Sequence, residues 1–285
     1  NVYNVAVGYN SGTAVTTGTA NTFIGGRAGD ATTTGSTNVA VGTDALGSNT
    51  TASNNVAIGY DCLVANTTGA TNTALGTSSL ATNTTASNNT AVGHGALTAN
   101  TTGTRNNALG NLSLVANTTG DNNVALGSQT LQANTTADDN TAVGYAALNV
   151  NTTGANNTAV GKFAGLAVTT GGYNTLVGSL AGDSITTAAN NVALGYLAGS
   201  AITTGAQNTA LGSGALSSTT TGLYNIGVGY DANSSSATVT GQCTLGDTNI
   251  TNLRCNDQTI SSLSDSRDKT DVIDSPYGLD FINTV

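Results

Sequence analysis

Residues 140–161 read NTAVGYAALNVNTTGANNTAVG, so the pentapeptide Asn-Thr-Ala-Val-Gly returns after seventeen residues. An unbroken period of this length predicts one small structural unit stacked on itself, because each unit buries its apolar side only against its neighbours. We therefore predict an all-β fold, a parallel β-solenoid of about fifteen 17-residue coils. The repeating glycine, which follows an aliphatic residue, defines position zero of each coil: Gly8, Gly25, Gly42, Gly59, Gly76, Gly93, Gly110, Gly127, Gly144, Gly161, Gly178, Gly195, Gly212, Gly229 and Gly246.

The residues before this glycine predict a strand with two different faces. Position −1 is Val, Ile or Leu in all fifteen coils, position −2 is Ala in eleven, and position −4 is Asn in the first fourteen. Since alternate residues of a strand face opposite sides, positions −3 and −1 predict an apolar face, and positions −4, −2 and 0 a flat face of small residues. We expect a second layer of protein on the flat face. Ala142→Arg is expected to disrupt either the coil or its assembly.

The residues after the glycine vary in a correlated way. Seven coils carry Leu at +4 with Asn at +7, as in Leu97 with Asn100, whereas five carry Gly at +4 with a β-branched residue at +7, as in Gly182 with Ile185. Packed interiors tolerate exchanges that keep the total volume, so both positions are predicted to fill one interior slot. We expect two short strands and two turns per coil, with a helical turn over +1 to +5 as the alternative.

Asn-Thr-Thr occurs seven times between residues 49 and 151 and matches the glycosylation pattern Asn-x-Ser/Thr. Stacked Asn and Thr side chains that bond between coils explain the same residues, and we favour this interpretation. An ice-binding solenoid is a further alternative. It needs a flat threonine array, whereas adjacent threonines of a strand point to opposite faces.

Position +1 varies freely, as expected of an exposed rim, and its tyrosines are candidate contacts for a glycan or protein receptor. A plain surface-turn role is the alternative. His94 belongs to the same column, and we assign no chemistry to it. The candidate binding residues are Tyr9, Tyr60, Tyr145, Tyr196 and Tyr230.

Composition excludes several classes of function. Only 7% of the residues are charged, the net charge is −9, and no basic stripe exists, which argues against nucleic-acid binding. Cys62, Cys243 and Cys255 lack paired spacing, so we expect no zinc site, no other metal and no cofactor. Scattered Asp residues without any Glu do not supply paired carboxylates for glycan hydrolysis. No apolar run approaches the roughly 20 residues of a membrane span, so we expect no membrane insertion.

The period stops after Gly246, which predicts three parts: a solenoid over 1–246, a neck over 247–263 and a separate end at 264–285. Apolar residues of the neck, such as Ile260 and Leu263, are spaced as if several chains met on an axis. Residues 264–273 read SDSRDKTDVI, and residues 277–283 read YGLDFIN. These two stretches resemble the start of the C-terminal intramolecular chaperone domain of bacteriophage tail fibres, particularly of the cyanophage type, and of endosialidases.

The resemblance implies a homotrimer whose chaperone cuts itself off between Leu263 and Ser264 after assembly. Ser264 would be the nucleophile and Lys269 the base that activates it. Only about 22 residues of the domain are present, so we expect no cleavage in the chain as given and assign it no activity on an external substrate.

The repeats, for example Asn157 to Gly161, resemble those that precede this chaperone in phage fibres. More loosely, they are similar to the heads of trimeric autotransporter adhesins, which are left-handed parallel β-rolls packed three around an axis. The resemblance implies a virion fibre protein made in the host cytoplasm. Its partners would be other tail or fibre proteins and a bacterial surface glycan or protein receptor. A bacterial trimeric adhesin head is the principal alternative.

Overall fold

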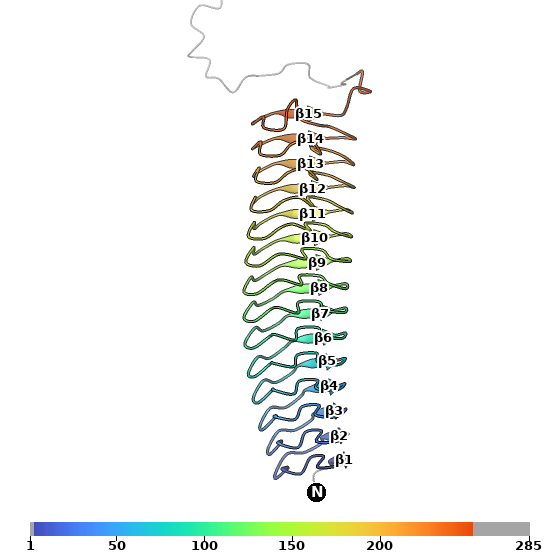
Figure 1. Ribbon diagram of the computed structural model, residues 1–285, viewed down its shortest axis with the longest axis vertical. Helices are drawn as coiled ribbons and strands as arrows, with labels where there is room; N and C mark the ends of the chain where they lie inside the picture. Colours follow the sequence, from blue (N-terminus) through green and yellow to red (C-terminus); the bar gives the residue numbers. More distant parts are fainter. Residues whose placement is uncertain (1–2, 253–285) are drawn as a thin grey trace, which may run out of the picture. The chain divides into compact units, whose positions relative to one another are not determined.

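The computed structural model describes residues 3–252, which form a stack of coils with one short strand per coil (Figure 1). The strands make a single parallel sheet in chain order, and each pairs with the strand seventeen residues further on, for example Ala142 with Ala159. The β-solenoid prediction is confirmed. The strands are β1 Val5–Val7, β2 Thr22–Ile24, β3 Val39–Val41, β4 Val56–Ile58, β5 Thr73–Leu75, β6 Thr90–Val92, β7 Asn107–Leu109, β8 Val124–Leu126, β9 Thr141–Val143, β10 Thr158–Val160, β11 Thr175–Val177, β12 Val192–Leu194, β13 Thr209–Leu211, β14 Ile226–Val228 and β15 Cys243–Leu245.

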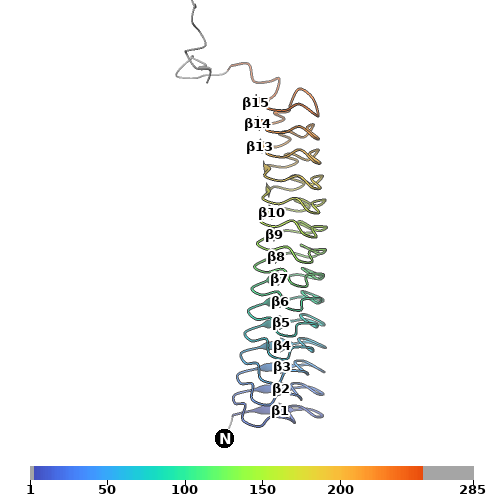
Figure 2. The same ribbon diagram turned by 90° about the vertical axis from the view of Figure 1, so that its left-hand side faces the viewer.

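The chain divides into two units, Asn1–Asn249 and Ile250–Val285, and the solenoid occupies the first. The view turned by 90° shows the strands on one side of the stack and turns on the other (Figure 2). Parallel strands lie about 4.8 Å apart, so fifteen of them span roughly 70 Å.

The flat face of small residues is the inside of the coil, and the expected second layer of protein covers it. In β9, Ala142 is fully buried, whereas Thr141 and Val143 on either side of it are partly exposed. The second layer over the Ala column is the turn segment of the same coil, not another protomer. Seventeen residues enclose so thin an interior that alanine is the side chain most coils accommodate at −2.

A second strand per coil was also expected, and it is not formed among the described residues. Positions +2 and +4 have left-handed backbone conformations, with φ of 54° at Ala146 and 50° at Leu148. Such residues bend the chain out of an extended course. The turn segment is nevertheless tied from coil to coil by backbone bonds, for example Leu97 N–H to the Ser113 carbonyl at 3.0 Å.

The prediction that the residues at +4 and +7 together fill one interior slot is confirmed. Leu97 and Ile185 are both fully buried. A Cβ added at Gly182 would lie 2.8 Å from Ile185 Cδ1 and 2.7 Å from Leu176 Cδ2, so the larger neighbours already fill the slot. The same column accepts glycine readily because its φ is positive, 56° at Gly182.

The repeating glycine is needed where one coil passes over the next. Gly93 has a φ of +133°, and a Cβ there would lie 2.5 Å from the carbonyl oxygen of Gly110. No other residue fits this backbone-to-backbone approach, which explains why the column is unbroken.

The asparagines at −4 form a buried ladder that closes each coil and joins it to its neighbours. Asn123 Nδ2 donates to the Ala137 carbonyl across the coil at 2.8 Å, and Asn123 Oδ1 accepts the backbone N–H of Asn140 at 3.1 Å. A second ladder runs through position +7, where Asn100 Nδ2 donates to Asn83 Oδ1 at 3.0 Å. Apart from Asn4 at the end of the stack, the asparagines of both columns are buried, so the stacking interpretation of Asn-Thr-Thr is confirmed.

Candidate functional site

The most unusual surface of the solenoid is the outer face of its sheet, formed by positions −3 and −1 of every strand; we call it the strand face. None of its residues is buried, and the residues at −1 are Val, Ile or Leu throughout. Leu109 is 51% exposed and Leu194 is 49% exposed. No charged residue occurs at either position in any of the fifteen coils.

Tyrosines flank the strand face on both sides. Those predicted at +1 are all exposed, from 47% at Tyr145 to 78% at Tyr9. A second set of exposed tyrosines occupies position +12, which was not among the predicted binding residues. The available signal was the recurrence of tyrosine in this column, because the backbone there is left-handed, with a φ of 59° at Tyr173, and strand alternation does not extend to it. The +1 tyrosines are Tyr9, Tyr60, Tyr145, Tyr196 and Tyr230, and the +12 tyrosines are Tyr3, Tyr173 and Tyr224.

One part of the +1 side concentrates aromatic side chains. The rings of Tyr145 and Phe163 meet edge to face with centroids 5.4 Å apart, and Lys162 Nζ lies 4.9 Å from the Phe163 centroid. In the next two coils Leu180 and Leu197 occupy the position of Phe163. An aromatic and aliphatic surface beside a single cation offers stacking contacts to a sugar ring or a peptide.

The two threonine columns do not alternate between inside and outside, which corrects another expectation. Position +8 is partly exposed, and its hydroxyl donates to the next coil, as from Thr101 Oγ1 to the Thr118 carbonyl at 3.0 Å. Position +9 is exposed, as at Thr102 and Thr119. Both columns lie outside the interior because the backbone bends at these two residues.

Within residues 3–252 no group of three or more His, Cys, Asp or Glu side chains is placed to hold a metal ion. His94 is exposed and lies 3.3 Å from Asn111 Nδ2. Cys62 is buried, and burial raises the pKa of its thiol to about 11, so it remains a neutral filler at neutral pH. Ser264, Lys269 and most of the predicted neck lie outside the described residues.

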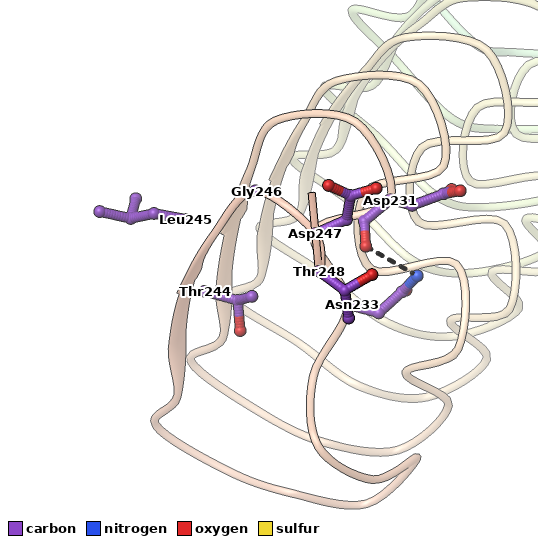
Figure 3. A pocket seen from close by; sticks show the side chains of 7 residues that line it. All are labelled: Asp231, Asn233, Thr244, Leu245, Gly246, Asp247 and Thr248. Atoms are coloured by element: carbon purple, nitrogen blue, oxygen red, sulfur yellow. Dashed lines mark hydrogen bonds between the residues drawn. The ribbon is translucent and has the colours of Figure 1, made fainter. Parts of the chain in front are cut away.

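An open groove of about 610 Å³ lies at β15, the last described strand (Figure 3). Asp231 and Asp247 lie on one side of it, and Thr244 occupies the −2 position that is alanine in most coils. The Oγ1 of Thr244 has no hydrogen-bond partner within the described residues. The remaining lining residues are Asn233, Leu245, Gly246 and Thr248.

Comparison with protein-family models, with curated proteins and with solved structures finds no match to this chain. Among the described residues no helix is long and apolar enough to cross a membrane.

Proposed function

We propose that the protein is a structural fibre protein of a bacterial virus, assembled as a homotrimer that attaches to the host surface. The observation that carries the proposal is the strand face. It carries no charge, its −1 column is Val, Ile or Leu in all fifteen coils, and its −3 column is mostly Val or Thr. Monomeric soluble proteins rarely expose so long an apolar surface. The resemblance of residues 264–285 to a trimer-assembling chaperone supports the same proposal.

A bacterial surface adhesin with the same architecture is the alternative that this geometry fits equally. The chaperone resemblance favours the virus, because that domain belongs to phage fibres and endosialidases. The outward position of both threonine columns favours an ice-binding solenoid as a second candidate. Inhibition of ice recrystallisation by the purified protein would support this second candidate.

Self-cleavage tests the viral assignment. The protein produced with a complete chaperone domain is expected to yield two fragments, the smaller beginning at Ser264. Ser264→Ala and Lys269→Ala should each give one uncut chain, because the first removes the nucleophile and the second its base. Trimer mass should persist in both variants. N-terminal sequencing that places the cut elsewhere contradicts the assignment, as does a wild-type chain that stays whole after assembly.

Adsorption to host cells tests attachment and the role of the tyrosines. Tyr145→Ala removes the ring that packs against Phe163 and is expected to weaken adsorption about tenfold, the effect of losing one aromatic contact of roughly 1.4 kcal/mol. Thr119→Ala, a change in the exposed +9 column, is the matched control. Unchanged adsorption by a correctly assembled Tyr145→Ala variant would remove this residue from the binding surface.

A further inference from the structure

We infer that the strand face is the surface on which copies of this chain meet, side by side, parallel and in register. The inference rests on the proposed homotrimer and names the surface that forms it. The flat Asn and Ala columns, which the sequence suggested for this role, are excluded because they lie inside the coil.

The solenoid distributes its apolar groups in an unusual way. Its interior is filled mainly by alanine, with one Leu or β-branched residue per coil, as at Leu97 or Ile202. A larger share of the Val, Leu and Ile side chains stands on the strand face, where water contacts them. Burying these side chains adds hydrophobic stabilisation of about 25 cal/mol per Å² of apolar area.

The regular spacing of the coils indicates which partner fits the strand face. A partner must present apolar groups about every 4.8 Å over roughly 70 Å and must not bring charge to the centre of the contact. A second copy of this chain meets each requirement, because its own strand face has the same spacing and no charged residue. A symmetry axis parallel to the stack places every coil level with its counterpart.

The available area is large enough for stable association. Only positions −3 to −1 are extended, so the strand face is three residues wide, roughly 10 Å. Over the length of the stack this gives on the order of 700 Å² per copy, close to the roughly 800 Å² per partner of a standard interface.

The distribution of polar groups also fits an interface. Charged residues are absent at −3 and −1 and first appear in the flanking columns, at Arg105, Asp139, Lys162 and Asp247. Tyrosines occur in the same flanks. An apolar centre with tyrosines and charges at its edge is the usual anatomy of a protein–protein interface.

Cysteine cross-linking tests the surface, the direction and the register together. In the protein produced with its complete chaperone domain, Cys243→Ser removes an exposed thiol, Cys255→Ser removes a thiol outside the described residues, and Cys62 is buried. Leu75→Cys on the strand face and Thr68→Cys in the exposed +9 column are then compared, using a short bifunctional maleimide. Both positions are exposed in the single chain.

Leu75→Cys is expected to give covalent dimers in at least tenfold excess over Thr68→Cys. Residue 75 lies away from the middle of the stack, so it meets itself only when the copies are parallel and in register. Trimer mass without cross-linking at residue 75, or with cross-linking at residue 68, overturns the assignment of the face. A monomeric mass instead contradicts the homotrimer itself, whereas normal cross-linking with no adsorption to host cells contradicts only the attachment function.

Discussion

Ala142→Arg is expected to unfold the coils around β9, whereas Val143→Arg is expected to leave them folded and to prevent assembly. The two residues are adjacent, but Ala142 is fully buried and Val143 is partly exposed on the strand face. Arginine at residue 142 has neither space nor a partner for its charge, and a loss of more than about 4 kcal/mol is the expected effect. Arginine at residue 143 reaches water in the single chain and becomes an unpaired buried charge only between copies.

Circular dichroism with urea unfolding measures the first effect, and light scattering measures the second. Thr119→Arg in the exposed +9 column is the matched control and should change neither the fold nor the mass. A stable Ala142→Arg variant would contradict the assignment of Ala142 to the interior of the coil. A Val143→Arg variant that still assembles would contradict the strand-face interface.

The asparagine ladder gives the second large effect. Asn123→Ala removes the acceptor of both the backbone N–H and the Nδ2 of Asn140 in a buried setting. The Ala137 carbonyl, in contrast, keeps Asn134 Nδ2 as a donor. Each unsatisfied buried group costs about 1–3 kcal/mol. We expect the free energy of unfolding to fall by about 2–5 kcal/mol.

Thr119→Ala is the comparison, because its exposed side chain is outside the ladder and its loss should change stability by less than about 0.5 kcal/mol. The urea unfolding midpoints of the two variants show whether the ladder bonds contribute to stability. Equal midpoints would mean that water replaces the ladder bonds without loss, and the ladder would then have no special part in stability.

Much of the fold is predictable from the sequence because a stack repeats each physical requirement fifteen times. The unbroken glycine column follows from backbone contact between coils, as at Gly93 above Gly110. The exchange between Leu97 with Asn100 and Gly182 with Ile185 indicates a shared interior slot through the pattern of residue types alone. Because each position of the coil recurs fifteen times, a residue type that stays the same in every coil indicates a physical requirement rather than chance.

The sequence pattern left open which face of the strand points inward, for a physical reason. Alternation shows that Ala142 and Val143 lie on opposite sides of a strand, but it does not show which side is enclosed. In a thick domain the Val face would be the core. Here the coil is so thin that Ala fills it, and the uniform Asn at −4 was the available signal, since a buried amide must keep its partners while an exposed one varies freely.

The backbone conformation of the turn segment was also not predicted from the pattern of residue types. Non-glycine residues with positive φ are uncommon, yet Leu97 has a φ of 52°. Five coils with glycine in the same column, such as Gly199 with a φ of 60°, indicate this conformation directly. The candidate site is less predictable than the fold, because the +1 tyrosines are visible in the sequence but their place beside the strand face is not.

The mass of the assembled protein tests the central claim most directly. Light scattering of the protein produced with its complete chaperone domain should give three times the mass of one chain, and Val143→Arg should give the mass of one chain with unchanged circular dichroism. A wild-type protein that is folded, soluble and monomeric would leave the strand face in water and would contradict the account.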